Sequence, residues 1–481
     1  MSLYLILIPF VSSLILLLAR PAASRSIALV ASLANLAITL FAFSGFNGDG
    51  SFNHEFSVPW VSSAGIHFRL GLDGISLLMV LLSNLLAPLI ILSSGGEKYH
   101  PDARYFGLLL MMLGALNGVF MALDGLLFYV FYELALIPIY FICAIWGGDN
   151  RIRVTLKFFI YTFAGSLFML VALIYMYLQT PGTHSFLWED LLSVQLSNGA
   201  AWWVALAFFL AFAVKMPIFP FHTWQPDTYT TAPTGGTMLL AGIMLKMGTY
   251  GVIRWMIPLA PEALHDLSPI FISLAVFGIV YASIIAIKQT DLKRLIAYSS
   301  IAHVGLIAAG IFAWNKVGVQ GSLLQMLNHG INVVGLFYVV EVLERRLGTR
   351  SLSEMGGIAK SAPNFAVLFM IIMLGAVAVP LTNGFPGEFL LLNGVWNYNP
   401  WLGALAGLTI IFGAVYMLRA YGLVMFGETN DSTANFEDIN MREWVVLGAV
   451  ALMVLVFGFF PQWILNITDG SVNRILGAVQ F

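Results

Sequence analysis

The sequence predicts an all-α, polytopic membrane protein with about fourteen transmembrane helices. Two observations support this fold class. Of the 481 residues, 59% are hydrophobic and only 10% are charged, whereas a soluble domain carries about 25% charged residues. Apolar stretches of about 20 residues, the length that crosses a hydrocarbon core of about 30 Å, recur along the whole chain. We therefore expect a lipid-embedded bundle without a sizeable soluble domain.

Composition argues against several kinds of site. The net charge of −2 gives no reason to expect nucleic-acid binding. Cys143 is the only cysteine, and a cysteine-ligated iron–sulfur cluster needs four. The sequence contains no glycine-rich dinucleotide fingerprint and no phosphate-binding loop. We therefore expect no cofactor in this chain.

The predicted spans follow the apolar stretches in order. They begin near Leu3, Ile27, Gly74, Tyr105, Leu126, Thr155, Ala201, Ala232, Pro269, Leu292, Val319, Pro363, Trp401 and Trp444. The first stretch, MSLYLILIPF, has neither a basic n-region nor a small-residue cleavage site, so we interpret it as a span rather than a signal peptide. The polar segment 45–71 alternates weakly and predicts a hairpin outside the bilayer. The polar linker 345–362 is expected at the membrane interface.

The positions of lysine and arginine predict the orientation. Most basic residues, Lys293 among them, follow odd-numbered spans, whereas the opposite side holds Arg69, Lys316 and Arg474. Basic loops stay in the cytoplasm, so both termini are predicted to face outward. Arg254 lies near a helix end, as does Arg419, and both are expected to snorkel towards the interface.

Two spans are interrupted by proline and glycine beside an ionisable residue. The seventh contains AFAVKMPIFPFHTWQPD over residues 211–227, in which two prolines follow Lys215. The twelfth contains VPLTNGFPGEFL over residues 379–390, in which a Pro-Gly pair precedes Glu388. Unpaired backbone groups and charges are both costly in lipid, so helices broken at membrane depth usually serve transport.

The two breaks also predict an internal repeat. Span 7 enters from outside and span 12 from inside, and each is the fourth in a set of five. We therefore predict two inverted five-helix repeats, at residues 104–258 (helices 4–8) and 268–427 (helices 9–13). Residues 1–103 would hold helices 1–3 with the external polar segment, and residues 428–481 would hold helix 14.

Ionisable residues at membrane depth define the candidate site: Glu133, Lys215, Lys246, His303, His329 and Glu388. Counting about 1.5 Å per residue from the nearest interface places these positions deep in the bilayer. A buried lysine relays protons only when its proton affinity can change, and a nearby carboxylate changes it. Glu133 and Lys215 suit such a switch. Lys246 suits a central relay, and Glu388 suits a terminal proton site.

Simpler interpretations of the acidic and basic residues stay open. Glu133 and Lys215 could form a static buried ion pair. Lys246 could snorkel through a long span. Glu388 could be a plain hydrogen-bonded carboxylic acid.

The histidines have alternatives as well. His303 and His329 could continue a proton wire between Lys246 and the second break. They could instead be satisfied core histidines, or ligate one haem from two helices. Just past the first break, His222 and Asp227 could line a proton entry or cap freed backbone groups.

Three motifs carry a family resemblance over about residues 70–462. KMPIFPFHTWQPD, then APTGGTMLLAGIMLKMGTYG, then DLKRLIAYSSIAHVG resemble the proton-translocating, antiporter-like subunits of respiratory complex I. These subunits are themselves similar to the large subunits of multisubunit cation/proton antiporters. GFPGEF places Glu388 where most relatives carry lysine, and so resembles the branch called subunit M in bacteria and subunit 4 in mitochondria and chloroplasts.

The sequence also departs from the family pattern. Tyr229 stands where relatives usually have histidine. The second break usually reads close to PGTSGFVGEF, and Leu381, Asn383 and Pro386 differ from it.

The resemblance implies both a function and residue roles. It implies a proton-pumping subunit of a membrane NADH:quinone oxidoreductase, beside other membrane-arm subunits. We expect a bacterial inner membrane rather than an organellar one. FMN and iron–sulfur clusters would lie in partner subunits. The implied roles are a coupled pair (Glu133, Lys215), a central site (Lys246), connecting groups (His303, His329) and a distal site (Glu388). The alternatives are a cation/proton antiporter subunit without a redox partner, a haem-bearing electron-transfer subunit and a purely structural spacer.

Overall fold

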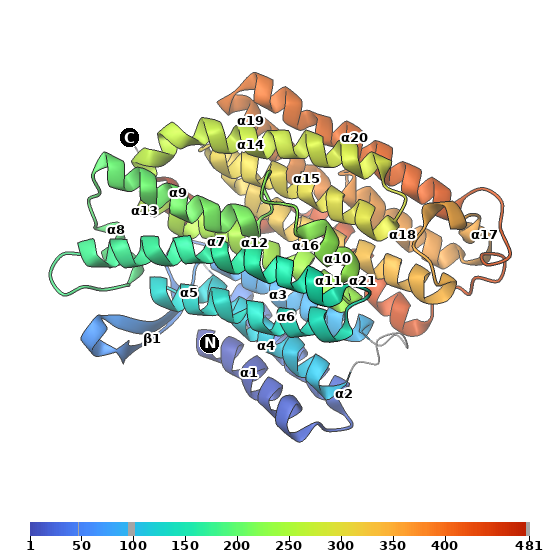
Figure 1. Cartoon of the computed structure of the whole chain (residues 1–481), viewed down its shortest axis with the longest axis horizontal. Coiled ribbons are helices and arrows are strands. Elements are labelled where there is room, and N and C mark those ends of the chain that lie inside the picture. The colour runs from blue at the N-terminus through green and yellow to red at the C-terminus, as the bar shows by residue number, and fades with distance from the viewer. Residues whose placement is uncertain (47, 95–101, 478–481) are drawn as a thin grey trace.

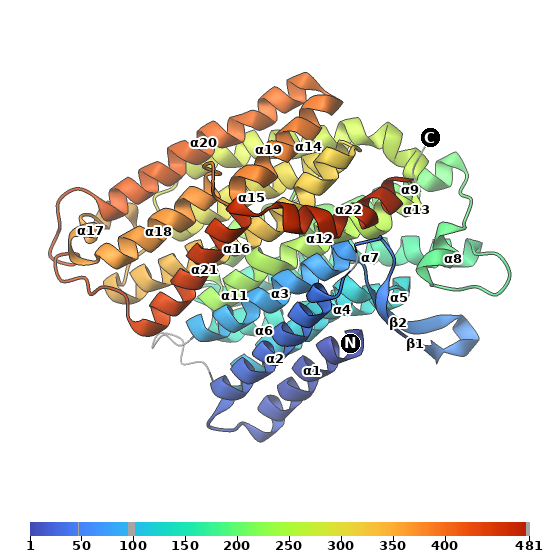
Figure 2. The same ribbon diagram turned by 180° about the vertical axis from the view of Figure 1, so that it is seen from behind.

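The computed structural model describes residues 1–46, 48–94 and 102–477, and these form a bundle of long helices lying side by side (Figures 1 and 2). Within these ranges, 13 helical stretches are long and apolar enough to cross a membrane. The twelfth predicted span adds a fourteenth in two pieces, because it is split into α18 (Pro363–Ala376) and α19 (Gly384–Tyr398). The predicted membrane-helix fold is confirmed.

The elements follow the chain in order. The first are α1 (Ser2–Ala19), α2 (Ser24–Ser44), β1 (Asn53–Val61), η1 (Ser62–Ala64), β2 (Ile66–Leu72), α3 (Gly74–Ser93), α4 (Ala103–Met121), α5 (Gly125–Leu134), α6 (Leu136–Trp146), α7 (Arg151–Gln179) and α8 (Trp188–Leu192). Next come α9 (Asn198–Lys215), α10 (Gln225–Thr231), α11 (Thr234–Leu239), η2 (Leu240–Met244), α12 (Leu245–Gly251), η3 (Val252–Met256) and α13 (Ile257–Leu259). The last are α14 (Pro261–Lys288), α15 (Leu292–Phe312), α16 (Lys316–Leu347), η4 (Leu352–Glu354), α17 (Ile358–Ser361), α18, α19, α20 (Pro400–Met425), α21 (Met441–Phe459) and α22 (Gln462–Gly477).

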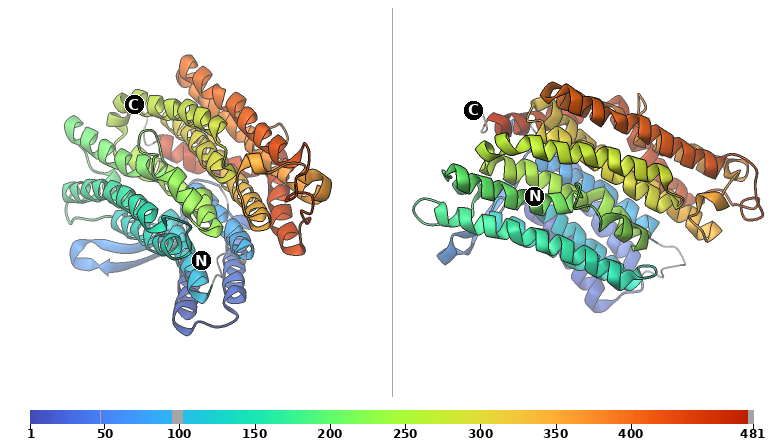
Figure 3. Two further views of the ribbon diagram at one scale, coloured as in Figure 1. Left: turned by 45° about the vertical axis from the view of Figure 1, so that its right-hand side comes forward. Right: turned by 45° about the horizontal axis from the view of Figure 1, so that its top comes forward.

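Burial sorts the helices into a core and a periphery. The apolar windows of α16 and of the span Thr234–Leu259 are wholly buried in the protein, and that of α15 is nearly so. By contrast, α1, α2 and α20 bury about a third of their apolar windows, and they lie at the edges of the bundle (Figures 1 and 3). Ionisable side chains are costly when they face lipid. Lys246, His303 and His329 all lie on the buried core helices.

The buried span Thr234–Leu259 is irregular. Two π-helical turns, η2 and η3, flank the short α-helix α12. A π turn is wider than an α turn, is rare, and frequently occurs at functional sites. Here the two π-helical turns offset α12, which carries Lys246, from the rest of the span.

The hairpin and the last helix lie outside the set of spanning helices. The predicted hairpin is present, since β1 and β2 pair antiparallel with Phe56 opposite Leu70, and its place outside the bilayer stays a prediction. After α21 the chain forms α22, a helix not predicted in the segment 428–481. Figure 2 shows α22 running across the bundle, and it packs on both α3 and α16. The hydroxyl of Ser471 on α22 accepts a hydrogen bond from the backbone N–H of Gly74 at the start of α3.

Candidate proton-transfer site

The first helix break is stabilised by hydrogen bonds from the protein itself. α9 ends at Lys215 and the chain becomes helical again in α10. Trp224 Nε1 donates a 2.9 Å hydrogen bond to the carbonyl oxygen of Val214. The backbone N–H of Ile218 donates to the carbonyl oxygen of Ala213 over 3.0 Å. Carbonyls freed at the break are therefore satisfied without lipid or solvent, which is the condition for non-helical backbone at membrane depth.

Lys215 occupies the last position of α9 and is 1% exposed. Its Nζ lies 5.0 Å from the ring centroid of Tyr132 on α5, within cation–π range. Within the described ranges, neither Lys215 Nζ nor Glu133 Oε1 has a hydrogen-bond partner. The predicted partners therefore lie in one region but are not joined by an ion pair in this conformation.

Lys246 is connected to the histidines. Lys246 is 1% exposed. Its Nζ donates a hydrogen bond to the carbonyl oxygen of Ala241 over 2.7 Å and lies 2.8 Å from His329 Nδ1. An ammonium group can only donate. His329 therefore accepts at Nδ1, and its neutral form carries the proton on Nε2. Lys246 does not snorkel towards an interface.

The two lysines lie on backbone segments in close contact. A Cβ on Gly248 of α12 would lie 2.9 Å from the carbonyl oxygen of Phe212 and 3.0 Å from the backbone nitrogen of Met216. Both of those atoms belong to the broken end of α9. Only a glycine lets α12 approach this closely, so the segment that carries Lys246 packs directly on the break that carries Lys215.

Glu388 meets His303 at the second break. His303 Nδ1 lies 2.9 Å from Glu388 Oε1, which is ion-pair range although the angle is not that of a hydrogen bond. Gln325 Nε2 donates to the same carboxylate oxygen over 3.3 Å. The imidazole rings of His303 and His329 are 6.0 Å apart between centroids. The structure thus brings Lys246, both histidines and Glu388 into one connected group.

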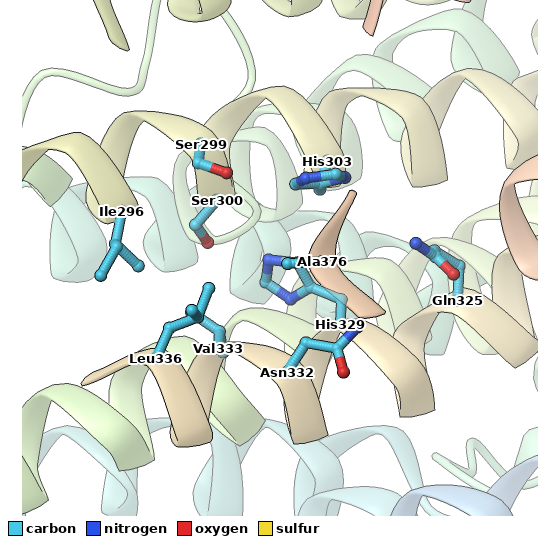
Figure 4. A pocket seen from close by; sticks show the side chains of 10 residues that line it. All are labelled: Ile296, Ser299, Ser300, His303, Gln325, His329, Asn332, Val333, Leu336 and Ala376. Carbon is cyan, nitrogen blue, oxygen red and sulfur yellow. The ribbon is translucent and has the colours of Figure 1, made fainter. Parts of the chain in front are cut away.

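A small cavity lies between the two histidine helices (Figure 4). Its lining residues are Ile296, Ser299, Ser300, His303, Gln325, His329, Asn332, Val333, Leu336 and Ala376. The centre of a water-sized sphere can occupy about 20 Å³ there, which is room for at least one water molecule. Ser300 Oγ, Asn332 Oδ1 and His329 Nε2 have no protein partner among the described residues. A water held by these atoms could bridge the 6.0 Å between the histidine rings.

The geometry does not fit a haem between the histidines. One ring nitrogen of His329 faces Lys246 at 2.8 Å, and His303 Nδ1 faces Glu388 at 2.9 Å. The cavity of about 20 Å³ is far smaller than a porphyrin, whereas pockets that hold ligands of that size measure roughly 300–1,000 Å³.

The second break is also closed by hydrogen bonds. Asn328 Nδ2 donates a 2.6 Å hydrogen bond to the carbonyl oxygen of Asn383, and the N–H of Asn383 donates to the carbonyl oxygen of Val454 over 2.9 Å. A Cβ on Gly387 would meet the Gln325 side chain and lie 3.2 Å from its Cβ atom. Glycine at this position therefore lets the start of α19 lie against α16, which brings Glu388 to the histidines.

Among the described residues, neither the His222 nor the Asp227 side chain forms a hydrogen bond with the backbone of the first break. The His222 ring is buried beside Tyr281, with 5.2 Å between ring centroids. Asp227 forms ion pairs with Lys157 at 2.9 Å and with Arg294 at 3.3 Å. Asp227 thus connects α10 to α7 and α15. Proton entry at these residues stays a prediction.

Two expectations from the sequence are wrong. Arg254 does not snorkel: it is 1% exposed, and its Nη2 lies 2.5 Å from Asp73 Oδ1. Lys293 is not a loop cation, because it is completely buried and its Nζ donates to the carbonyl oxygen of Ala232 over 2.8 Å. Both partners lie far away in the sequence, so no local pattern indicated them.

A buried carboxylate also escaped the sequence analysis. Glu341 lies on α16, close to its charged end, and is not among the candidate residues that the sequence indicated. In the structure it is 6% exposed and accepts a hydrogen bond from the hydroxyl of Thr234. Twelve residues separate it from His329 on α16, which is about 120° around the helix at 3.6 residues per turn, so the spacing did not indicate a shared face.

Comparison with known proteins places the chain in a family. A family model described as "NADH:quinone oxidoreductase/Mrp antiporter, TM" matches residues 122–413. Among curated relatives, NADH-quinone oxidoreductase subunit M of Rickettsia conorii is 43% identical over 87% of this chain and 85% of that protein. The subunit M of Escherichia coli strain K12 is 36% identical over 98% of this chain and 97% of that protein.

Solved structures give the same result. A chain of respiratory complex I from Thermus thermophilus with bound NADH is 34% identical, with a TM-score of 0.93 and coverage of 100% of both chains. A chain of the Mrp complex from Dietzia sp. has a TM-score of 0.85 over 99% of this chain and 98% of that chain. At 18% identity that second match shows a shared fold alone. The chain belongs to the family of membrane subunits that NADH:quinone oxidoreductases share with Mrp antiporters.

Proposed function

We propose that this chain is a proton-translocating membrane subunit of an NADH:quinone oxidoreductase. The observation that carries the proposal is the buried connection from Lys246 through His329 and His303 to Glu388. Its two close approaches are 2.8 Å and 2.9 Å, and it joins the regions of the two helix breaks. The names of the subunit M relatives and the likeness to a complex I chain support the assembly in which this connection would work.

Proton transfer along this connection needs only small movements. Lys246 gives a proton to His329 Nδ1, and His329 releases the proton on Nε2 to the water-sized cavity. His303 accepts that proton and passes it to the Glu388 carboxylate. Each transfer leaves both imidazoles in the opposite tautomer, Lys246 neutral and Glu388 protonated. The line resets when the rings turn or exchange their protons, Lys246 takes a proton from Lys215 and Glu388 releases its own, and the acid–base properties of imidazole suit it to such relays.

Glu133 and Lys215 would act as the switch at the start of the line. Two unit charges 4 Å apart interact by about 4 kcal/mol at an effective dielectric constant near 20. Moving one charge through 100 mV costs about 2.3 kcal/mol. Closing the pair would therefore hold a proton on Lys215 against a membrane potential, and opening it would make that proton available to Lys246.

Redox chemistry would take place in partner subunits, which would hold FMN and iron–sulfur clusters, while this chain contributes a single cysteine, Cys143. Neighbouring membrane-arm subunits would transmit conformational and electrostatic change to the Glu133–Lys215 pair. We assign the chain to a bacterial inner membrane with both termini on the periplasmic side, and the excess of basic residues in the odd-numbered loops supports this orientation.

Substitution of the switch residues tests the proposal. Glu133→Ala or Lys215→Ala in the intact complex is expected to leave assembly unchanged and to abolish redox-driven proton pumping, measured in inverted membrane vesicles. The exposed Glu262, changed to alanine, is the matched control and is expected to pump normally. Normal pumping in either switch variant would overturn the proposal.

A cation/proton antiporter subunit is the second candidate, because the matching family model covers both groups. Purification of the native assembly separates the two. Copurification with flavin- and iron–sulfur-bearing subunits supports the oxidoreductase, and cation/proton exchange by an assembly without them supports the antiporter.

A further inference from the structure

A second group of buried ionisable residues lies outside the line from Lys246 to Glu388. We call Lys293, Glu341 and Thr234 the inner cluster, since it lies on the side predicted to face the cytoplasm. Lys293 and Glu341 are 0% and 6% exposed. The Thr234 hydroxyl donates to Glu341 Oε2, and Lys293 Nζ donates to the carbonyl oxygen of Ala232. Both contacts fix the start of the span that carries Lys246.

The inner cluster lies on the same two helices as the histidine pair. Lys293 precedes His303 on α15, and Glu341 follows His329 on α16. The cavity at the histidines extends between these helices towards the cluster as far as Ile296, Val333 and Leu336 (Figure 4). Ile296 is about one turn from Lys293, and Leu336 is about 7.5 Å along the helix from Glu341.

The space between the histidine pair and the inner cluster is lined by polar side chains near the histidines and by apolar side chains near the cluster. Ser300 Oγ and Asn332 Oδ1 line the cavity without a protein partner among the described residues, so they can hold water. Ile296, Val333 and Leu336 then form an apolar collar before the inner cluster. Apolar constrictions of this kind control passage by wetting and drying.

The inner cluster also connects to the protein surface. Arg350, whose side chain is 28% exposed, lies 3.1 Å from Asp291 Oδ2 and 3.9 Å from Glu344 Oε2. Glu344 lies one turn beyond Glu341 on α16. Buried and partly exposed ionisable groups therefore follow one another from the end of α16 towards solvent.

We propose that Glu341 is a proton-donating residue that reloads the histidine pair from the cytoplasmic side, an inference that rests on the proposed proton-translocating function. The proton leaves a carboxyl oxygen of Glu341, crosses the collar on transient water, and binds an imidazole nitrogen that has just passed its proton to Glu388. Lys293 and the Thr234 hydroxyl stabilise the resulting carboxylate. A proton from the cytoplasmic solvent restores the carboxylic acid.

The test compares Glu341→Gln with Glu354→Gln in the intact complex, since Glu354 is an exposed glutamate on the same predicted side. Glu341→Gln is expected to assemble normally and to lower NADH:quinone turnover and pumping about tenfold or more. Loss of a positioned acid typically lowers a rate by about a hundredfold or more. Its solvent deuterium isotope effect is expected to rise, because proton delivery becomes rate-limiting. Glu341→Asp is expected to recover most of the activity, and Glu354→Gln to match the unaltered complex.

Three results would overturn the inference. The first is normal turnover and pumping in Glu341→Gln. The second is loss of activity in proportion to loss of assembled complex, with an unchanged isotope effect. The third applies if Glu341→Gln fails to assemble. In that case Leu336→Phe, which narrows the collar, is measured instead, and unaltered turnover with an unaltered isotope effect in that variant would overturn the inference. Lys246→Ala, measured in parallel, separates the two proposals. Normal pumping in Lys246→Ala refutes the proposed function itself. Loss of pumping in Lys246→Ala together with normal pumping in Glu341→Gln refutes only the role of the inner cluster.

Discussion

The two broken helices place opposite charges at opposite helix ends. Lys215 is the last residue of α9, where the helix dipole favours a cation. Glu388 lies about one turn into α19, near the helix end that favours an anion. Each break therefore presents the charge that its own backbone stabilises.

The two charges differ in their partners. Lys215 Nζ has no hydrogen-bond partner in the described part of the chain and faces only the Tyr132 ring. Glu388 receives a hydrogen bond from Gln325 and lies 2.9 Å from His303 Nδ1. The first break thus holds a charge that is free to change partner, and the second holds a charge built into a network. This difference suits a switch at one end and a fixed acceptor at the other.

At the networked break, the expected effect is nearly as large as the loss of pumping expected for the switch variants. Glu388→Gln keeps the size and the contact with Gln325 but removes the proton acceptor, so redox-driven pumping is expected to fall about a hundredfold. Proton uptake by reconstituted complex checks this, with the exposed Glu437 changed to glutamine as the control. Unchanged pumping in Glu388→Gln would mean that the second break does not carry protons.

At the first break, coupling between the two charges is the quantity to measure. Glu133→Gln, Lys215→Gln and the double variant form a double-mutant cycle on turnover. Residues that interact during the cycle are expected to show a coupling of about 1–3 kcal/mol, because non-additivity of that size marks interacting sites. Additive effects would show that Glu133 and Lys215 never meet, and would remove the distinction between a switch and a fixed acceptor.

Sequence patterns predicted both breaks and placed His303 and His329 between Lys246 and the second break, but they did not predict which atoms meet there. Proline and glycine beside Lys215 and Glu388 are local features, and local features indicate where a helix must end. The approach of His303 to Glu388 instead depends on how α15 packs against α19, which no neighbouring residues encode. The same holds for Arg254 and Asp73, whose pairing converts an apparent snorkelling arginine into a buried ion pair.

Helix periodicity had similar limits. An apolar run of about 20 residues predicts a span but does not distinguish α12 from the π turns around it, since hydrophobicity is continuous there. α22 was missed because its apolar positions are interspersed with polar ones, and its place depends on contacts with distant elements. Ser471, for example, binds the start of α3.

A smaller effect concerns the side chains that close the breaks. Trp224→Phe removes the hydrogen bond to the carbonyl oxygen of Val214, and Asn328→Leu removes the one to the carbonyl oxygen of Asn383. Each variant leaves a buried carbonyl unpaired, so each is expected to lower stability by about 1–3 kcal/mol. Thermal unfolding of the purified complex measures both. If only one of the two variants unfolds at the unaltered temperature, the two breaks are stabilised by different interactions.

The smallest effect concerns α22, which reaches the second half through Asp469. A hydrogen bond from Lys316 lowers the pKa of the Asp469 carboxyl. A carboxyl with a depressed folded-state pKa stabilises the fold above its unfolded pKa of about 3.9, and that contribution is lost as the pH falls through the folded-state pKa. Both side chains are over 40% exposed, so Asp469→Asn is expected to cost at most about 1 kcal/mol at neutral pH.

The pH dependence supplies the check on this prediction. The difference in melting temperature between Asp469→Asn and the unaltered protein is expected to narrow as the pH falls below about 4. The exposed Asp431, changed to asparagine, serves as the control. A difference that is constant with pH would mean that the Asp469 charge contributes nothing.

The central claim is that one buried line connects the switch to the acceptor through Lys246, and replacing that lysine tests it most directly. Lys246→Ala removes the donor to His329 Nδ1 and leaves both breaks intact. Redox-driven proton pumping by the reconstituted complex, normalised to assembled enzyme, is the measurement. The account predicts a fully assembled complex whose pumping is lost. Pumping at the unaltered rate and stoichiometry would contradict it.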